Sequence, residues 1–394
     1  MGAMAAGFGG SSDFSIGIEE ELLLVEPEEY RLSHTSDQVL AALVLDERSA
    51  RHDLYAAQIE LSSPPSASVD EAVRSLLSLR DAVSATGATV IGAGIHPSAV
   101  FSNVEITDAD RYREAASALG GIVRRTPDCA LHVHVGMPDA DTAIRVCNGL
   151  REHLPLLEAL AANSPFWHGL DSGHASARRV LRRSFPRVVA PPHFHDYADY
   201  QQRVERSMSA AGLPDYTFVW WEVRPHPRFG TVEVRAMDSQ ASMASVAGIS
   251  AFVQALARQI AEGDSPAVTG PELLEESSFR AGRDGLRAEI WQAGAAGDVL
   301  GSGSWAPVPD LLAQVLDRVR PHARELGADG PLEELERVAR EGNGADRQRL
   351  AHRNGGMAGV LRLLVGETRE TAEARDIPTA GGASFRNPAT RATS

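Results

Sequence analysis

The sequence has few cysteines, fewer basic than acidic residues and no long apolar segment. Two of its 394 residues are cysteine, and Cys129 and Cys147 lie in apolar contexts without a CxxC pair, which argues against a disulfide framework and a thiolate metal site. No segment approaches the roughly 20 apolar residues of a membrane-spanning helix. Because 38 Lys and Arg stand against 53 Asp and Glu, the net charge of -15 disfavours nucleic acid and anionic membranes as partners.

Length and composition indicate one large globular domain or two closely packed ones. The chain is 43% hydrophobic, which is enough for a substantial buried core. Residues 1–13 are rich in Gly, Ala and Ser and lack the basic start and apolar run of a signal peptide. The C-terminal residues are rich in Ala, Gly, Thr and Pro. We therefore expect a cytoplasmic protein with disordered tails at residues 1–13 and 369–394 and a single domain at residues 14–368.

The segment 230–235 combines charge with the alternation of a strand. Side chains alternate between the two faces of a strand, so Glu233 and Arg235 share one face while Val232 and Val234 share the other. The valines can join a core. The charged pair must face water, a metal or a ligand, because a buried unpaired charge is costly.

Other predicted strands repeat this pattern of polar residues backed by Ile, Leu and Val. Their polar side chains are Glu19 and Glu21, Gln58 and Glu60, His132 and His134, and Arg224. Two acids on one strand face repel each other unless a cation lies between them. Carboxylates with an occasional imidazole suit Mg²⁺ or Mn²⁺, whereas Zn²⁺ sites use more His and Cys. If these strands pair, their shared face is an oxygen-rich metal site with arginines beside it.

The rest of the chain is mostly helical in pattern. Ser68 is a candidate N-cap for a helix to Ala85, and further helices are expected at about 242–260, 272–292, 307–325, 331–340 and 345–366. The region from residue 163 to 195 is polar and aromatic and contains a short basic helix, and we interpret it as a wall of the substrate site. Its arginines are alternatively a solvated helix face: Arg178, Arg179, Arg182 and Arg183.

Several of these segments together resemble the type 2 glutamate-cysteine ligases, in particular the YbdK-type carboxylate-amine ligases. The matching motifs are collinear between about residues 14 and 367 and comprise Gly17–Glu21, Gln58–Glu60, His132–Gly136, Ala162–Trp167, Arg224–Pro225, Gly230–Arg235 and Arg347–Arg349. The resemblance implies an α+β, glutamine synthetase-like catalytic fold. Such a fold has a curved, mainly antiparallel sheet of about six strands, with a metal and ATP site on its concave face and helices flanking it.

The resemblance also implies roles for individual residues. Glu19, His132 and Glu233 would hold one metal ion, and Glu21 and Glu60 a second. His134 would face the ATP phosphates. Arg235 and Arg224 would bind the acyl phosphate or the substrate carboxylate, which makes Glu233 and Arg235 the expected catalytic residues.

The implied reaction joins a carboxylate to an amine. The carboxylate attacks the γ-phosphate of ATP in the presence of Mg²⁺ or Mn²⁺, and the amine then displaces phosphate from the acyl phosphate. The expected substrates are a small glutamate-like carboxylate and an amine, with cysteine as one candidate. The resemblance further implies a homo-oligomer, which we expect to be a dimer.

Two other functions compete with this interpretation. A metal-dependent amidohydrolase also has HxH on a strand, but it needs further metal-binding His and Asp on later parallel strands. A non-catalytic binding protein on the ligase fold would be indicated by loss of a metal-position residue, and none is lost. The sequence gives no basis for assigning four histidines of the loops: His174, His193, His195 and His226.

Overall fold

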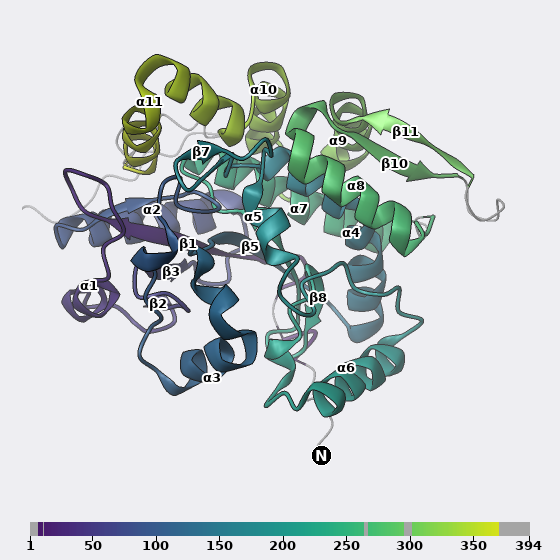
Figure 1. Cartoon of the computed structure of the whole chain (residues 1–394). Coiled ribbons are helices and arrows are strands. Elements are labelled where there is room, and N and C mark those ends of the chain that lie inside the picture. The colour runs from purple at the N-terminus through teal and green to yellow at the C-terminus, as the bar shows by residue number, and fades with distance from the viewer. Residues whose placement is uncertain (1–6, 11, 264–266, 295–301, 370–394) are drawn as a thin grey trace, which may run out of the picture.

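A seven-stranded antiparallel sheet forms the centre of the protein (Figure 1). The computed structural model describes residues 7–10, 12–263, 267–294 and 302–369. Neighbouring strands follow the order β2, β3, β1, β5, β9, β8, and β4 pairs with β1. The strands are β1 (Ile16–Val25), β2 (Ala50–His52), β3 (Gln58–Ser62), β4 (Thr89–Ile91), β5 (Ala130–Gly136), β8 (Val223–His226) and β9 (Thr231–Asp238). The expected α+β fold is confirmed, with seven strands rather than about six.

The alternation of side chains gives this sheet one apolar face and one polar face. On the apolar face, Ile18, Val133 and Val234 are fully buried in the main core. The register pairs Glu19 with His132, and Glu21 with Glu60. Since residues paired across antiparallel strands lie on the same face, the polar residues meet on the opposite side from the core.

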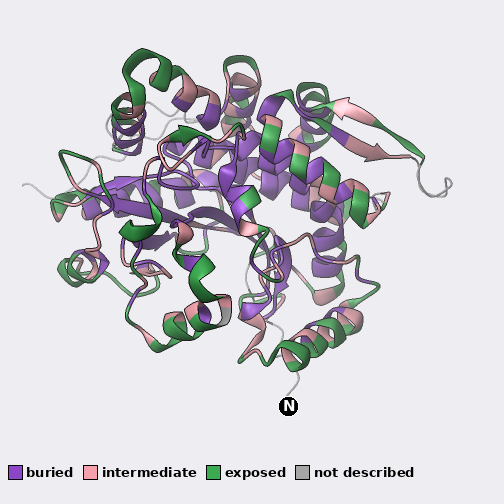
Figure 2. Cartoon of the chain, in the orientation of Figure 1, coloured by how far each residue is buried: buried purple, intermediate pink, exposed green. Residues whose placement is uncertain are grey.

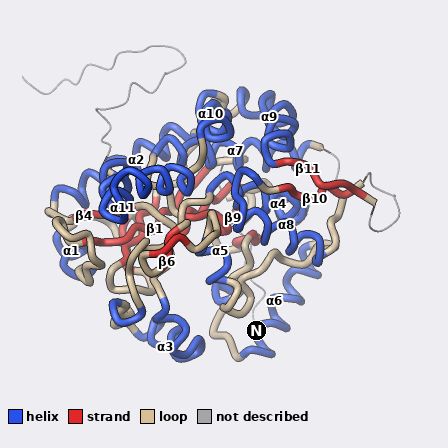
Figure 3. Tube along the Cα trace, turned by 45° about the horizontal axis from the view of Figure 1, so that its top comes forward, coloured by secondary structure: helices blue, strands red, loops and turns tan. Residues whose placement is uncertain are grey.

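Helices α2 (Val69–Ala85), α4 (Ala140–Ala161) and α7 (Met243–Glu262) cover the apolar face. Figure 2 shows the sheet together with the inner sides of α4 and α7 as the most buried part of the chain. As predicted, Ser68 caps α2, and its side chain accepts a hydrogen bond from the Glu71 N–H. Helices α9 (Val308–Glu325) and α10 (Glu333–Glu341) pack against α7 in a further layer, and Figure 3 shows how the helices gather above the strands.

Smaller elements surround the polar face and the edges of the sheet. In Figure 1, α3 and α6 lie below the sheet, on the side away from α2 and α7. The remaining elements are α1 (Ser36–Ala42), α3 (Asp110–Leu119), α5 (Ala177–Arg182), α6 (Tyr197–Ala211), α11 (Gly344–Thr368), β6 (Phe166–Trp167), β7 (Leu170–Asp171) and the 3₁₀ turns η1 (Phe101–Asn103), η2 (Gly120–Arg125), η3 (Tyr216–Phe218), η4 (Gly285–Arg287) and η5 (Gly330–Leu332).

The helix expected at 272–292 is wrong in its second half. Helix α8 (Pro271–Asp284) ends at Gly285, whose φ of 57° is a conformation that glycine adopts readily. The chain then forms β10 (Glu289–Ala293), which pairs with β11 (Gly303–Pro307) as a hairpin. In this hairpin Trp291 lies opposite Trp305. An aromatic cross-strand pair therefore favours the strand over continuation of the helix.

The two expected tails fall largely outside the described residues, namely 1–6, 11 and 370–394. Within the first of them, Gly7 and Gly9 donate backbone hydrogen bonds to Pro227 O (2.7 Å) and Met137 O (2.9 Å). No helix in the described part of the chain is both long enough and apolar enough to cross a bilayer.

Candidate active site

All the residues that the sequence predicts for the site line one cavity of about 410 Å³ on the polar face of the sheet. These residues are Glu19, Glu21, Glu60, His132, His134, Arg224, Glu233 and Arg235. They come from five different strands, so the antiparallel register, rather than any one loop, brings them together. Their location is thus observed, while their roles stay predictions.

One group of possible metal ligands combines two carboxylates with an imidazole. Ligand atoms of Glu19, His132 and Glu233 lie within 4.8 Å of one another. His132 lies opposite Glu19 in the ladder between β1 and β5, with His132 Nδ1 3.5 Å from Glu19 Oε2. The register between β5 and β9 shifts between Leu131 and Val133. Such a bulge changes how the strand presents its side chains beside the site.

A second group consists of three carboxylates. Glu21, Asp53 and Glu60 also have ligand atoms within 4.8 Å of one another. Asp53 directly follows β2. Only Glu21 and Glu60 of this group were predicted from the sequence, and Asp53 was not included. The signal that could have found it is the spacing of Arg51 and Asp53, since residues two apart in an extended segment share a face.

The two groups differ in how well their negative charge is compensated. Burial would raise the pKa of Glu19, but His134, His132 and Arg51 hold it well below its usual value. In the second group burial raises the pKa of Glu21 to about 8, with a contribution from the Asp53 carboxylate. Burial and neighbouring carboxylates also raise the pKa of Glu60 and of Asp53. The second group therefore carries more negative charge than its surroundings neutralise.

Three arginines on the polar face pair with these carboxylates. Arg224 Nε donates to Glu233 Oε2 (2.7 Å), and Arg235 donates to the other oxygen of the same carboxylate. These two guanidinium groups, with His134 and His132, keep the pKa of Glu233 well below its usual value although burial acts in the opposite direction. Arg51, which the sequence reading did not include, donates through Nη2 to Glu19 Oε1 (3.2 Å) and to Glu60 Oε1.

The two histidines of β5 are buried and only partly paired. His132 Nδ1 and His134 Nε2 lack hydrogen bonds to described residues, and His134 Nε2 lies 3.7 Å from Glu19 Oε2 and 3.9 Å from Glu233 Oε1. Burial and the nearby Arg235 lower the pKa of His132 to about 3, so its imidazole is neutral. A neutral imidazole is the form that binds a metal ion.

The donor chemistry of the cavity fits Mg²⁺ or Mn²⁺. It offers five carboxylates and one neutral imidazole in two groups, with buried polar atoms that lack partners. Hard divalent cations prefer oxygen ligands. Cysteine ligands would favour a softer metal, and no cysteine is among the described residues that line the cavity.

Of the unassigned histidines, only His226 is among the described residues that line the cavity. Its ring stacks on Phe229 with centroids 4.2 Å apart, and the His134 ring lies 5.7 Å away. His174, His193 and His195 lie outside the lining. The end of β8 and the turn after it thus contribute a stacked pair of rings to the site.

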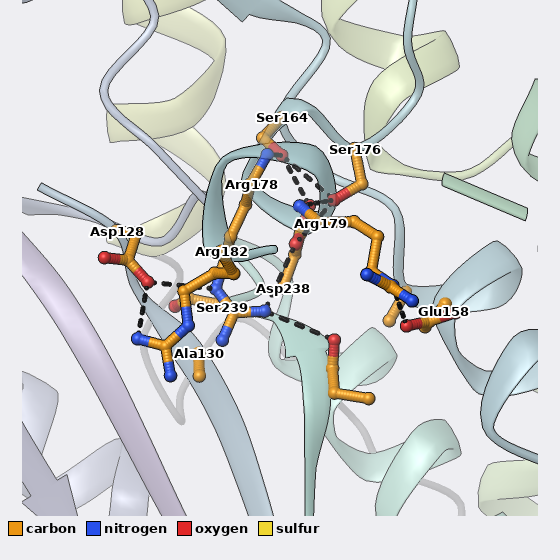
Figure 4. Close-up of polar contacts among 12 residues, drawn as sticks. Asp128, Ala130, Glu158, Ser164, Ser176, Arg178, Arg179, Arg182, Asp238 and Ser239 are labelled. Atoms are coloured by element: carbon orange, nitrogen blue, oxygen red, sulfur yellow. Dashed lines mark hydrogen bonds and ion pairs between the residues drawn. The ribbon is translucent and has the colours of Figure 1, made fainter. Parts of the chain in front are cut away.

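The basic helix α5 contributes mainly to structure. Figure 4 shows Arg178 and Arg182 reaching toward Asp128 and Asp238, while Arg179 reaches to Glu158. Arg178 and Arg179 are buried, so they do not form a solvated helix face. Arg182 lines the cavity and donates to Asp128 Oδ2 (3.0 Å). The expected substrate wall therefore includes one of the four arginines, while Arg178 holds α5 to Asp238 of β9 and Arg179 holds it to Glu158 of α4.

Two further motifs of the sequence pair with each other away from the cavity. The Gln348 side chain donates to Asn163 O (2.9 Å) and Oδ1 (2.8 Å), and Asn163 in turn donates to Gly92 O (3.0 Å) and Ser239 O (2.8 Å). A Cβ on Gly94 would lie 2.5 Å from the Asp238 carboxyl carbon. These residues thus serve close packing behind the site.

Known proteins resemble this chain over almost its whole length. A model of the family described as "Glutamate-cysteine ligase family 2" matches residues 15–367. Two relatives from Rubrobacter xylanophilus are named "Putative glutamate--cysteine ligase 2-3" and "2-1". The first is 37% identical over 372 residues, covering 93% of this chain and 100% of the relative. The second is 34% identical over 369 residues, covering 91% and 96%.

Solved structures share the fold at low sequence identity. A glutamate-cysteine ligase from Francisella tularensis, solved in complex with AMP, has a TM-score of 0.67 at 15% identity and covers 93% of this chain and 91% of its own. A bifunctional glutathione synthetase from Pasteurella multocida has a TM-score of 0.61 at 16% identity, with 92% of this chain and 52% of its own covered. At such identities the likeness concerns the fold alone.

Proposed function

Because this chain belongs to glutamate-cysteine ligase family 2, we propose that it is an ATP-dependent carboxylate-amine ligase. The reaction forms an amide through an acyl phosphate and releases ADP and phosphate. The observation that carries the proposal is the cavity in which two groups of metal ligands lie beside Arg224 and Arg235. Phosphoryl transfer depends mainly on positioning and on neutralising charge, and this cavity offers both.

Each set of residues has a role in this proposal. Glu19, His132 and Glu233 hold one Mg²⁺ or Mn²⁺, and Glu21 and Glu60 hold a second with Asp53 as a further ligand. Metal ions bound there would neutralise the phosphate oxygens of ATP. The AMP complex of the Francisella structure supports a nucleotide site on this fold.

The arginines and His134 act on the reacting groups. Arg235 lies beside the first ligand group, where its planar fork can bind two oxygens of a carboxylate or a phosphate. His134 Nδ1 lies 3.0 Å from Thr231 Oγ1, which fixes the ring beside Glu19 and Glu233. In this position His134 faces the phosphates, and Arg182 offers a further positive charge to an acidic substrate.

The proposed substrates are a glutamate-like carboxylate and an amine, with cysteine as one candidate. The names of the relatives support this class. The homodimer and the cytoplasmic location stay predictions.

Phosphate release from ATP, measured with panels of carboxylates and amines, tests the function. We expect release of ADP and phosphate only when a carboxylate, an amine and Mg²⁺ or Mn²⁺ are all present, and loss of release in excess chelator. ADP formation that persists in excess chelator would contradict the metal-dependent mechanism. Cleavage of amides without ATP would instead indicate the amidohydrolase. Nucleotide binding without turnover for any pair would favour the non-catalytic binding protein.

A further inference from the structure

One guanidinium group touches a carboxylate from each of the two ligand groups. Arg51 Nη2 donates to Glu19 Oε1 (3.2 Å), which belongs to the group with His132, and to Glu60 Oε1, which belongs to the group with Asp53. The strand register explains this position, since Arg51 on β2 lies directly opposite Glu60 on β3. A single positive charge therefore lies between both groups.

Arg51 differs from Arg224 in what holds its guanidinium group, and from Arg235 in contacting both ligand groups rather than one. The Arg224 side chain is 6% exposed, and its Nη1 donates to Val219 O (2.8 Å) and Thr217 O (3.1 Å) in addition to the contact with Glu233. The Arg51 side chain is 41% exposed. Across residues 7–10, 12–263, 267–294 and 302–369, its guanidinium has no hydrogen-bond or ion-pair partner other than Glu19 and Glu60. Arg224 is thus anchored to the backbone, whereas Arg51 is held only by two carboxylates of the ligand groups.

We propose that Arg51 is a tethered counter-ion that a divalent metal ion displaces when it enters the site. The inference rests on the metal site of the proposed function. Without metal, five carboxylates face one cavity, and Arg51 neutralises part of their charge. A divalent cation bound to either group would be repelled by Arg51 and would compete with it for the carboxylate oxygens of Glu19 and Glu60. The long, half-exposed side chain allows Arg51 to turn toward solvent when a metal ion takes its place beside Glu19 and Glu60.

This competition predicts that removing the Arg51 charge strengthens metal binding. The experiment measures Mn²⁺ binding to the nucleotide-free full-length protein, by the loss of the paramagnetic signal of free Mn²⁺ and by calorimetry. We expect R51Q to bind Mn²⁺ about tenfold more tightly than the wild type, which corresponds to a modest electrostatic effect. R51K keeps the charge and should stay near the wild-type affinity.

A matched control comes from the same cavity. Arg111 also lines it, but its polar partners in the described chain are Thr217 and Asp215 rather than a ligand carboxylate. R111Q removes the same charge at a distance from the ligand groups, so its Mn²⁺ affinity should change much less than that of R51Q. Equal gains in both variants would mean that overall charge, rather than displacement of Arg51, controls binding, and would overturn the proposal.

A direct signal from the wild type covers the case in which R51Q fails to fold. The guanidinium Nη–H resonance that R51K lacks identifies Arg51, because both of its contacts run through Nη2, and Mg²⁺ is a diamagnetic probe. On saturation with Mg²⁺ we expect this proton to exchange faster with water, because Arg51 has lost its two partners. An unchanged resonance, while other resonances of the cavity shift, would overturn the proposal.

The outcomes separate this inference from the proposed metal site. If the wild type binds Mn²⁺ and R51Q binds it equally or more weakly, the displacement of Arg51 is wrong and the metal site stands. If neither protein binds Mn²⁺, both the metal site and the inference are wrong.

Discussion

The two faces of strand β1 use adjacent glutamates in different ways. On the core side, Glu20 is fully buried, and both of its carboxylate oxygens accept hydrogen bonds from Arg80 (2.9 and 2.6 Å). The same guanidinium donates to Ala241 O (2.7 Å) and Gln240 O (2.9 Å). On the cavity side, Glu21 is one residue away. Its Oε2 accepts hydrogen bonds from Gln58 Nε2 (3.1 Å) and the Ala130 N–H (2.7 Å), but no arginine in the described chain forms an ion pair with it.

A second pair of regions shows the same difference. Asp238, behind the sheet, accepts hydrogen bonds from Asn163 N (2.9 Å), Ser164 Oγ (2.7 Å) and Ser176 Oγ (2.9 Å). In contrast, Asp53 and Glu60 lie at the cavity, where their ligand atoms are within 4.8 Å of one another and of Glu21. Buried charge that is fully paired holds elements together, whereas buried charge that is only partly paired marks the place where a cation or ligand binds.

The largest expected effect comes from breaking the paired side. Arg80→Met leaves Glu20 buried without a partner, and losing one member of a buried ion pair costs about 3–5 kcal/mol of unfolding free energy. Urea denaturation measures this loss. Arg74→Met is the matched control, because Arg74 lies exposed on the same helix α2 and its replacement should change stability by less than about 0.5 kcal/mol. Similar losses in both variants would show that the ion pair between Arg80 and Glu20 contributes no more to stability than an exposed arginine does.

The next effect contrasts two arginines that share the Glu233 carboxylate. Arg235 Nε is buried without a hydrogen-bond partner among the described residues, whereas Arg224 is bound to backbone carbonyls. We expect Arg235→Lys to lower kcat about a hundredfold, the scale of losing one preorganised charge donor. Arg224→Lys should mainly raise KM for the carboxylate substrate and leave KM for ATP nearly unchanged.

Steady-state kinetics with both substrates varied distinguish these two roles. If Arg224 instead controlled kcat and Arg235 only KM, the arginine anchored to the backbone would be the catalytic one. The rule that a partly paired buried charge, such as the Arg235 guanidinium, marks function would then fail within the site itself.

The sequence predicts the site well where alternation along one strand is enough. A spacing of two residues places Glu19 and Glu21 on one strand face, and the same holds for His132 and His134. Their hydrophobic neighbours indicate which side of the strand belongs to the core. It fails where the deciding partner is far away in the chain. Glu20 interrupts the apolar face of β1, and only the fold brings Arg80 to it.

The same reason explains the other differences between sequence and structure. Arg178 and Arg179 read as a basic helix face, because their carboxylate partners Asp238 and Glu158 lie elsewhere in the sequence. Asp53 follows a strand of only three residues, which is too short for alternation to stand out. In β10, the pairing of Trp291 with Trp305 depends on a second strand further along the chain, which local pattern does not reveal.

The smallest expected effect tests the cavity face of β1 through the pH dependence of the free energy of unfolding. The pKa of Glu21 is raised to about 8, chiefly by burial. Between about pH 4.5 and pH 8, the folded protein therefore keeps a proton that the unfolded chain has lost, so the free energy of unfolding falls as the pH rises through this range. Because the amide of Gln does not titrate, Glu21→Gln should be more stable than the wild type at pH 8 in chelator, and equally stable near pH 5.

Thermal unfolding in chelator, followed from pH 5 to pH 8, measures this difference. Glu20→Gln is the paired contrast, since removing the partner of Arg80 should destabilise the protein throughout that pH range. Addition of Mn²⁺ should stabilise the wild type more than Glu21→Gln, because the metal ion supplies the positive partner that the Glu21 carboxylate lacks. If Glu21→Gln were destabilised in chelator as strongly as Glu20→Gln, the carboxylates on both faces of β1 would be equally well paired, and the distinction between them would be wrong.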